Sequence, residues 1–246
     1  AYTQPQRSST EQSSDLVGYM FDPALLGINM TMLQTLFPFS IKTGLGVAWS
    51  LTVELIFYVV MPLLAIVAFY AGKRLRGRWR LLLASTPVIA MLLIGVIGKL
   101  VKASMFAGLP AGLEFYHEWG ANWYAVFSRS FFTHADLFAF GMLAALTVAA
   151  LEAEVIPHRY AGRIRVTSAI VAILGLAGTR AVDGDFREAV FAFVFGAVLV
   201  FVAVPGKTGS AGAVARGLDF LPLRYTGLVS YSFYLWHLPV MWLAIR

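Results

Sequence analysis

The sequence predicts an all-α protein, a polytopic bundle of transmembrane helices, from three observations. Its 246 residues are 59% hydrophobic and only 13% charged, whereas a soluble domain carries about 25% charged residues. The apolar residues lie in long runs, and roughly 20 such residues cross the hydrocarbon of a bilayer. Most basic residues gather in short loops between those runs, which is where membrane topology uses them.

Six apolar runs are predicted spans, and they are separated by short polar loops. They cover approximately residues 49–71, 81–98, 132–151, 166–179, 189–204 and 225–245. The fourth and fifth runs are short, so we expect these helices to be tilted or extended by flanking residues. The region 23–47, before the first span, is broken by Pro38, Gly44 and Gly46, which favours a surface loop or re-entrant segment.

The loops on the two sides of the membrane differ in charge. Those after the first, third and fifth spans carry eleven of the nineteen Lys and Arg and three acidic residues. The other side carries eight basic and eight acidic residues. Because positive loops stay in the cytoplasm, we predict that residues 1–48 form an extracytoplasmic polar segment and loop. The transmembrane domain is then 49–246.

Several function classes are excluded by what the sequence lacks. It contains no Cys, so it forms no disulfide, no thiolate metal site and no cysteine acyl-enzyme. The four His residues are scattered without metal-ligand spacing, and we expect no metal site. No phosphate-binding loop or soluble-hydrolase motif occurs. The basic loops belong to no nucleic-acid-binding motif, so no nucleic acid partner is expected.

Two acidic residues, Glu54 and Asp136, fall inside predicted spans. A carboxylate in hydrocarbon costs several kcal/mol unless it is paired or hydrated, so each is a candidate functional residue. Ser50, Glu54 and Tyr58 follow at helical spacing and share one helix face. Pro62 can kink this helix and open a polar cavity. The alternative is a structural carboxylate paired with an Arg or Tyr of a neighbouring helix.

The last span contains a second polar cluster, SYSFYLWH, at residues 230–237. Ser230, Tyr234 and His237 share a helix face there, and a His can act as an acid, a base, a hydrogen-bond donor or a proton relay. The alternative is an aromatic belt in which His237 closes a hydrogen bond between helices.

Two further groups of polar residues lie on the predicted outer side. His134 and Asp136 open the third span, where polar groups cost little, so a structural role is the stronger alternative for Asp136. The loop 114–119, EFYHEW, mixes acids, a His and aromatic rings. It suits either a sugar site or a surface helix, and we favour the surface helix.

Two of these regions resemble the acyltransferase-3 family of membrane O-acyltransferases. Residues 32–38 and then 49–58, WSLTVELIFY, resemble its WSLxxExxFY region, and residues 225–239 resemble the pattern of its last helix. Residues 134–141 resemble a weaker R-x-D-x-x-x-x-G element, with His134 in place of the usual Arg. The two stronger patterns stand in the family's order.

The resemblance implies a bundle of roughly nine to ten spans, of which about six are present here. It implies transfer of an acetyl or other acyl group from acyl-CoA, most simply acetyl-CoA, to a hydroxyl of a cell-surface sugar, glycan or metabolite. It also implies membrane lipid as a partner, no bound cofactor and a bacterial cell membrane. The family's early Arg/Lys…His motif has no match in residues 1–48, so we expect a longer protein with three more leading spans. This chain alone is then expected to be inactive.

The resemblance also assigns roles to residues. It implies that a His of the early motif removes the proton of the acceptor hydroxyl, that Glu54 orients this His or the substrate, and that His237 supplies hydrogen bonds. We predict Glu54 and His237 as catalytic residues. The predicted substrate-binding residues are Trp49, Ser50, Tyr58, His134, Asp136, Tyr231, Ser232 and Tyr234.

Two alternative functions from other classes stay open. One is a non-catalytic membrane scaffold, which would need no buried polar face. The other, a proton-coupled transporter or flippase of a glycan or lipid-linked substrate, would bury Glu54, Asp136 and His237. Such a protein is expected to show repeat symmetry between its halves, and the sequence contains no internal repeat.

Overall fold

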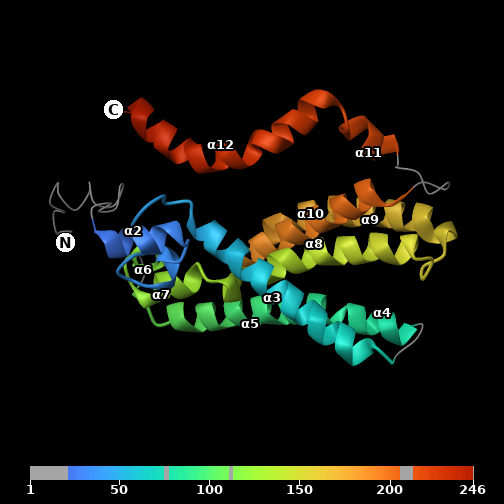
Figure 1. Ribbon diagram of the computed structural model, residues 1–246, viewed down its shortest axis with the longest axis horizontal. Helices are drawn as coiled ribbons and strands as arrows, with labels where there is room; N and C mark the ends of the chain where they lie inside the picture. The colour runs from blue at the N-terminus through green and yellow to red at the C-terminus, as the bar shows by residue number, and fades with distance from the viewer. Residues whose placement is uncertain (1–21, 75–77, 111–112, 206–212, 246) are drawn as a thin grey trace. The chain divides into compact units, whose positions relative to one another are not determined.

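The computed structural model describes residues 22–74, 78–110, 113–205 and 213–245, and within them it contains helices and no strand (Figure 1). The helices are α2 (Pro23–Met30), α3 (Trp49–Gly72), α4 (Arg78–Ala84), α5 (Thr86–Phe106), α6 (Glu114–Trp119), α7 (Trp123–Ser128), α8 (Phe131–Glu152), α9 (Ala161–Gly178), α10 (Asp185–Ala203), α11 (Ala213–Leu218) and α12 (Leu221–Ile245). Short 3₁₀ turns cover Gln34–Leu36, His158–Tyr160 and Thr179–Ala181. Most of the predicted extracytoplasmic segment before α2 lies outside the described residues.

Five helical stretches among the described residues are long and apolar enough to cross a membrane. They are Trp49–Gly72, Leu82–Phe106, Trp123–Glu152, His158–Ala181 and Asp185–Ala203. They coincide with the first five predicted spans, so the prediction of an all-α polytopic membrane protein is confirmed. The sixth predicted span falls on α12, a helix of 25 residues that is not among these five.

The predicted end of the second span was wrong. The prediction ended it at residue 98 and placed Lys99 and Lys102 in an outer loop, whereas α5 continues to Phe106. A charge count treats a lysine as the end of a span, but lysine is a good helix former and is tolerated inside a span when it is paired. The fourth span is extended at its start, as expected, because α9 begins at Ala161.

The chain divides by its internal contacts into two units. The first holds the described parts of residues 22–56, 101–131 and 229–245, and the second holds those of residues 57–100 and 132–228. Helices α3, α5 and α12 each contribute to both units.

The first unit begins with a short helix and a set of turns rather than a crossing. The Asp22 carboxylate accepts a hydrogen bond from the backbone N–H of Ala24 at 2.8 Å and caps α2, with Pro23 at the first helical position. The eight residues of α2 are too few to span a bilayer. The Thr52 hydroxyl donates to the Met32 carbonyl at 2.5 Å, which attaches the turns to α3.

The second unit contains a group of three helices, α8, α9 and α10. Leu151 at the end of α8, Ala161 at the start of α9 and Val204 just after α10 form one buried cluster. The three helices therefore alternate in direction along the chain. A second cluster joins Ala172 of α9 to Val194 and Ala197 of α10. Small residues let helix backbones approach closely, which is how helices associate when lipid supplies no hydrophobic drive.

Helices α5 and α8 pack antiparallel in the second unit, through glycine. A Cβ placed on Gly95 would stand 2.6 Å from the Cβ of Asp136, and one placed on Gly98 would collide with the carbonyl of Phe132. Nothing larger than hydrogen is accommodated at these positions. The Phe57 ring of α3 stacks on Phe138 of α8, with the ring centroids 4.2 Å apart.

This close approach predicts different outcomes for two glycines. Gly98→Ala should destabilise the protein by about 1–3 kcal/mol, because the added methyl group overpacks the contact between α5 and α8. Gly141 of α8 has no atom within 4 Å of such a methyl group, so Gly141→Ala should be neutral or slightly stabilising. Thermal unfolding in detergent measures both, and equal effects would contradict the packing.

Candidate functional site

The two regions that the sequence analysis singled out meet in the first unit. The hydroxyl of Ser50, in the first turn of α3, lies 2.8 Å from the hydroxyl of Tyr234 in α12. Each hydroxyl also lies within hydrogen-bond distance of the Val47 carbonyl oxygen, at 3.2 and 3.3 Å. Because each has a single hydrogen, one hydroxyl donates to this carbonyl and the other donates to the first hydroxyl. The predicted substrate-binding residues Ser50 and Tyr234 are therefore in contact, although 184 positions separate them in the chain.

The register of this contact separates the two predicted catalytic residues. Ser50 meets Tyr234, and Gly46 lies against the side chain of Leu238, so the two segments run in opposite directions. Glu54 lies one turn beyond Ser50, and His237 lies about one turn beyond Tyr234 on the other side of the contact. At 1.5 Å per residue, Glu54 and His237 are roughly 10 Å apart along the helices. They form no direct pair but bracket the Ser50–Tyr234 bond.

The hydrogen bond of His237 determines which ring nitrogen can take a proton. Nδ1 lies 2.5 Å from the carbonyl oxygen of Tyr234, and because a carbonyl only accepts, Nδ1 carries the hydrogen. In the neutral ring Nε2 is then the basic nitrogen. The His237 side chain is exposed, and its ring centroid lies 5.7 Å from that of Tyr234.

Glu54 is half-buried and receives no hydrogen bond or ion pair from the residues that the structure describes. Within those residues, the partner Arg or Tyr of the structural alternative is not observed. Trp49, at the start of the same helix, is half-buried. Of the other predicted site residues, Tyr231 and Ser232 are exposed on α12, and Tyr58 is exposed on the part of α3 that belongs to the second unit.

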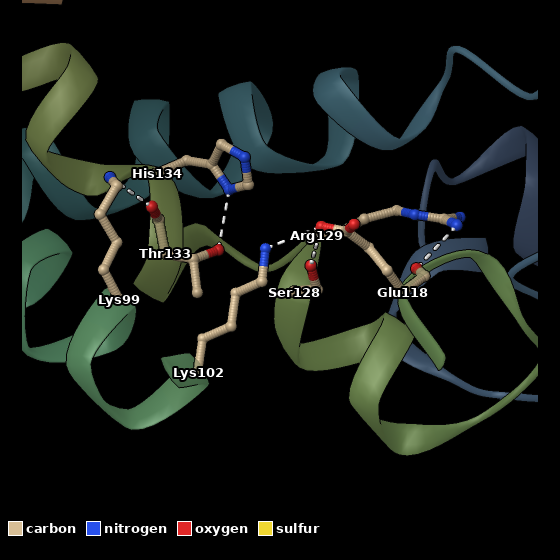
Figure 2. A network of polar contacts seen from close by, with 7 residues as sticks. All are labelled: Lys99, Lys102, Glu118, Ser128, Arg129, Thr133 and His134. Atoms are coloured by element: carbon tan, nitrogen blue, oxygen red, sulfur yellow. Dashed lines mark hydrogen bonds and ion pairs between the residues drawn. The ribbon is translucent and has the colours of Figure 1, made fainter. Parts of the chain in front are cut away.

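Asp136 and His134 lie in the second unit, in a different environment. Lys99 Nζ is 2.5 Å from Asp136 Oδ1 and donates to the Thr133 carbonyl at 2.8 Å. Both members of this ion pair are only 1% exposed. The second oxygen, Oδ2, has no hydrogen-bond partner among the described residues. His134 is half-buried, and its Nδ1 lies 2.9 Å from the Thr133 hydroxyl (Figure 2).

Sequence reasoning missed Lys99 because it placed the residue in a loop. The useful signal was its position next to a long apolar run, together with an unpaired acid inside the following span. The ion pair occupies one oxygen of Asp136, so direct contact of Asp136 with a substrate would use Oδ2 or displace Lys99. The substrate-binding roles of Asp136 and His134 stay predictions.

A third polar group surrounds Glu118 in the first unit (Figure 2). Its carboxylate accepts from Lys102 Nζ at 2.7 Å and from the Ser128 hydroxyl at 3.2 Å, and its backbone carbonyl accepts from Arg129 at 3.1 Å. The Arg129 guanidinium also stacks over the Trp119 ring, 4.2 Å from its centroid. The segment is a helix, α6, as the surface-helix alternative requires, and Glu118 ties it to α5 and α7.

These contacts leave three groups of polar side chains with different tasks. Within the Lys99–Asp136 pair, the two charges compensate each other. Within the Glu118 cluster, the Glu118 carboxylate is likewise paired with Lys102. The Ser50–Tyr234 contact instead leaves the Glu54 carboxylate and the His237 Nε2 without such a partner. Among the described residues, no three His, Asp or Glu side chains gather as metal ligands.

The comparison with protein families identifies the family of the chain. A family model described as an acyltransferase domain matches residues 11–246. The chain belongs to the acyltransferase-3 family. Neither the curated proteins nor the solved structures contain a match. This membrane acyltransferase therefore has the Ser50–Tyr234 contact inside its matched domain.

The buried ion pair of the acyltransferase predicts a non-additive double mutant. Lys99→Met or Asp136→Leu alone should cost about 3–5 kcal/mol, because each leaves a buried charge without its partner. The double variant should recover most of that loss, since it buries no charge. Thermal unfolding of all four proteins measures the coupling, and additive losses would contradict it.

The Ser50–Tyr234 bond predicts a smaller coupling. Tyr234→Phe and Ser50→Ala should each destabilise by about 0.5–1.5 kcal/mol, and the double variant should cost little more than either. Tyr231→Phe is the matched control, because the Tyr231 side chain is 52% exposed on the same helix. A loss at Tyr231 equal to that at Tyr234 would argue against the contact.

Proposed function

We propose that the protein transfers an acetyl or other acyl group from acyl-CoA to a hydroxyl of a cell-surface sugar, glycan or metabolite, in a bacterial cell membrane. Family membership supports acyl transfer in general. The observation that carries the specific reaction is the His237 ring, whose Nδ1–H is held by the Tyr234 carbonyl and whose exposed Nε2 can accept a proton.

The chemistry at His237 follows from this tautomer. The proposal assigns proton transfer to His237, in place of the early-motif His that the family resemblance implies. The acceptor hydroxyl donates a hydrogen bond to Nε2, which directs its oxygen at the thioester carbonyl carbon. As the new C–O bond forms, the proton passes to Nε2, and the Tyr234 carbonyl stabilises the resulting imidazolium through Nδ1–H. The C–S bond then breaks, and the leaving thiolate takes the proton from Nε2 to give the free thiol of CoA. His237 ends as it began.

Glu54 has a separate task because it lies roughly 10 Å along the helices from His237. A carboxylate accepts hydrogen bonds at both oxygens, so it suits two hydroxyls of a sugar. We propose that Glu54 binds the acceptor away from the reacting hydroxyl, with Ser50 and Tyr234 forming the wall between. Trp49, Tyr231 and Ser232, which belong to the same unit, complete the proposed substrate contacts. The substrate-binding roles of Tyr58, His134 and Asp136 stay predictions from the sequence.

The test is acyl transfer by the full-length protein in proteoliposomes, with radiolabelled acetyl-CoA and a sugar acceptor. His237→Gln should lower kcat by about 10²–10⁴-fold, because glutamine accepts a hydrogen bond but does not take the proton. Glu54→Gln should mainly raise KM for the acceptor. The controls His158→Gln and Glu152→Gln change residues of the same types outside the site.

Three outcomes would count against the proposal. Normal turnover by a folded His237→Gln protein would remove His237 from proton transfer. An unchanged KM in Glu54→Gln would remove Glu54 from acceptor binding. Movement of the sugar across the membrane without an acylated product would favour the transporter alternative.

A further inference from the structure

A cavity of about 560 Å³ lies between α8, α9 and α10, and none of its lining residues takes part in the proposed reaction. The end lined by Phe140, Phe193 and Gly196 is called the inner end, and the end lined by Tyr160 and Arg163 is called the outer end. These names refer to the cavity and not to the two sides of the membrane. Most of the remaining lining is aliphatic. The inner end is closed because a Cβ on Gly196 would already stand 3.0 Å from Phe140, and the Phe140 and Phe193 rings meet edge to face.

The depth of the cavity matches one leaflet of a bilayer. Along α9 the lining runs from Arg163 to Val171, a rise of eight residue steps, which is about 12 Å at 1.5 Å per step. The hydrocarbon of a bilayer is about 30 Å thick, so each leaflet supplies about 15 Å. An alkyl chain that enters from the end with Tyr160 and Arg163 and stops at Phe140 has the reach of one lipid tail.

The interior offers few hydrogen bonds to an occupant. The Thr147 hydroxyl donates to the Leu143 carbonyl at 2.8 Å, and the Ser168 hydroxyl donates to the Arg165 carbonyl at 2.9 Å. Both hydroxyl hydrogens are therefore used within their own helices, and of the three lining Ser and Thr hydroxyls only that of Thr167 makes no hydrogen bond with the described residues. A buried amide without a partner is costly, which disfavours the amide-containing arm of CoA, whereas a hydrocarbon chain needs no partner.

The outer end carries cations beside an aromatic ring. The exposed Arg163 guanidinium lies 5.9 Å from the centroid of the Tyr160 ring and makes no hydrogen bond with the described residues. Arg159 lies 5.0 Å from the same centroid. Arg165 is used elsewhere, on the Val204 carbonyl. Glu152 and Glu154, in the same connection between helices, are exposed and are not part of the lining.

We propose that this cavity binds one acyl tail of an anionic membrane phospholipid, with the lipid phosphate at Arg163 and the Tyr160 ring at the headgroup level. Arginine suits phosphate, and tyrosine suits the membrane interface. The apolar interior, the single-leaflet depth and the cationic outer end together favour a phospholipid. The proposal is independent of the proposed acyl transfer.

Native mass spectrometry of the full-length protein, released from bilayers of mixed phosphatidylglycerol and phosphatidylcholine, tests it. The wild type should retain one phosphatidylglycerol. Thr167→Trp, which fills the cavity, should abolish retention. Arg163→Gln should lower the preference for phosphatidylglycerol about fivefold, the effect of one cation near a membrane surface.

Matched controls separate the site from general effects. Val166→Trp alters the neighbouring, exposed residue of α9 outside the lining, and Arg216→Gln removes an exposed cation far along the chain. Both should retain the lipid as the wild type does. If Thr167→Trp fails to fold, Leu143→Trp fills the cavity from α8 instead.

The proposal is overturned if the filling variant keeps its lipid, or if Arg163→Gln leaves the lipid preference unchanged. It is also overturned if palmitoyl-CoA displaces the lipid at equal or lower concentration, since the cavity would then belong to the acyl donor. Loss of acyl transfer in the His237→Gln protein has no bearing on these results.

Discussion

Hydrocarbon offers a charged side chain no hydrogen bond, so a charge inside a membrane helix needs a partner from the protein. The Lys99–Asp136 ion pair supplies that partner between α5 and α8. Two buried charges at 2.5 Å compensate each other, and the glycines of α5 let the helices come close enough for the lysine to reach. The Thr133 carbonyl accepts a second hydrogen bond from the ammonium group. The packing of α5 on α8 therefore depends on a polar contact as much as on apolar shape.

Helix α8 then contacts different neighbours at two levels along one face. Asp136 is turned to α5, whereas Phe140 and Leu143, one and two turns further on, line the cavity shared with α9 and α10. The ion pair stabilises the contact of α8 with α5, and the later part of α8 borders an incompletely filled space. A lipid tail, the solvent of the membrane interior, is the proposed occupant of this space.

The cost of an unpaired polar group in hydrocarbon separates polar side chains that have protein partners from those that have none. The charges around Glu118 compensate one another, and the hydroxyls of Thr147 and Ser168 donate to carbonyls of their own helices. Glu54 and the Nε2 of His237 do not follow this pattern among the described residues. A polar group kept inside a bundle of apolar helices without a protein partner costs free energy, and the proposed binding of a substrate would offset that cost.

The sequence by itself determined the fold class, the first five spans and the family, because hydropathy and a short motif are properties of neighbouring residues. It also located Ser50, Tyr234 and His237 as a candidate site. It could not determine that Lys99 belongs to a helix, since a charge next to an apolar run ends a span unless a partner is known. That partner lies 37 positions away, and the partner of Ser50 lies 184 away. The separation of Glu54 from His237 and the cavity between α8, α9 and α10 depend on helix register and packing, so only the tertiary structure decided them.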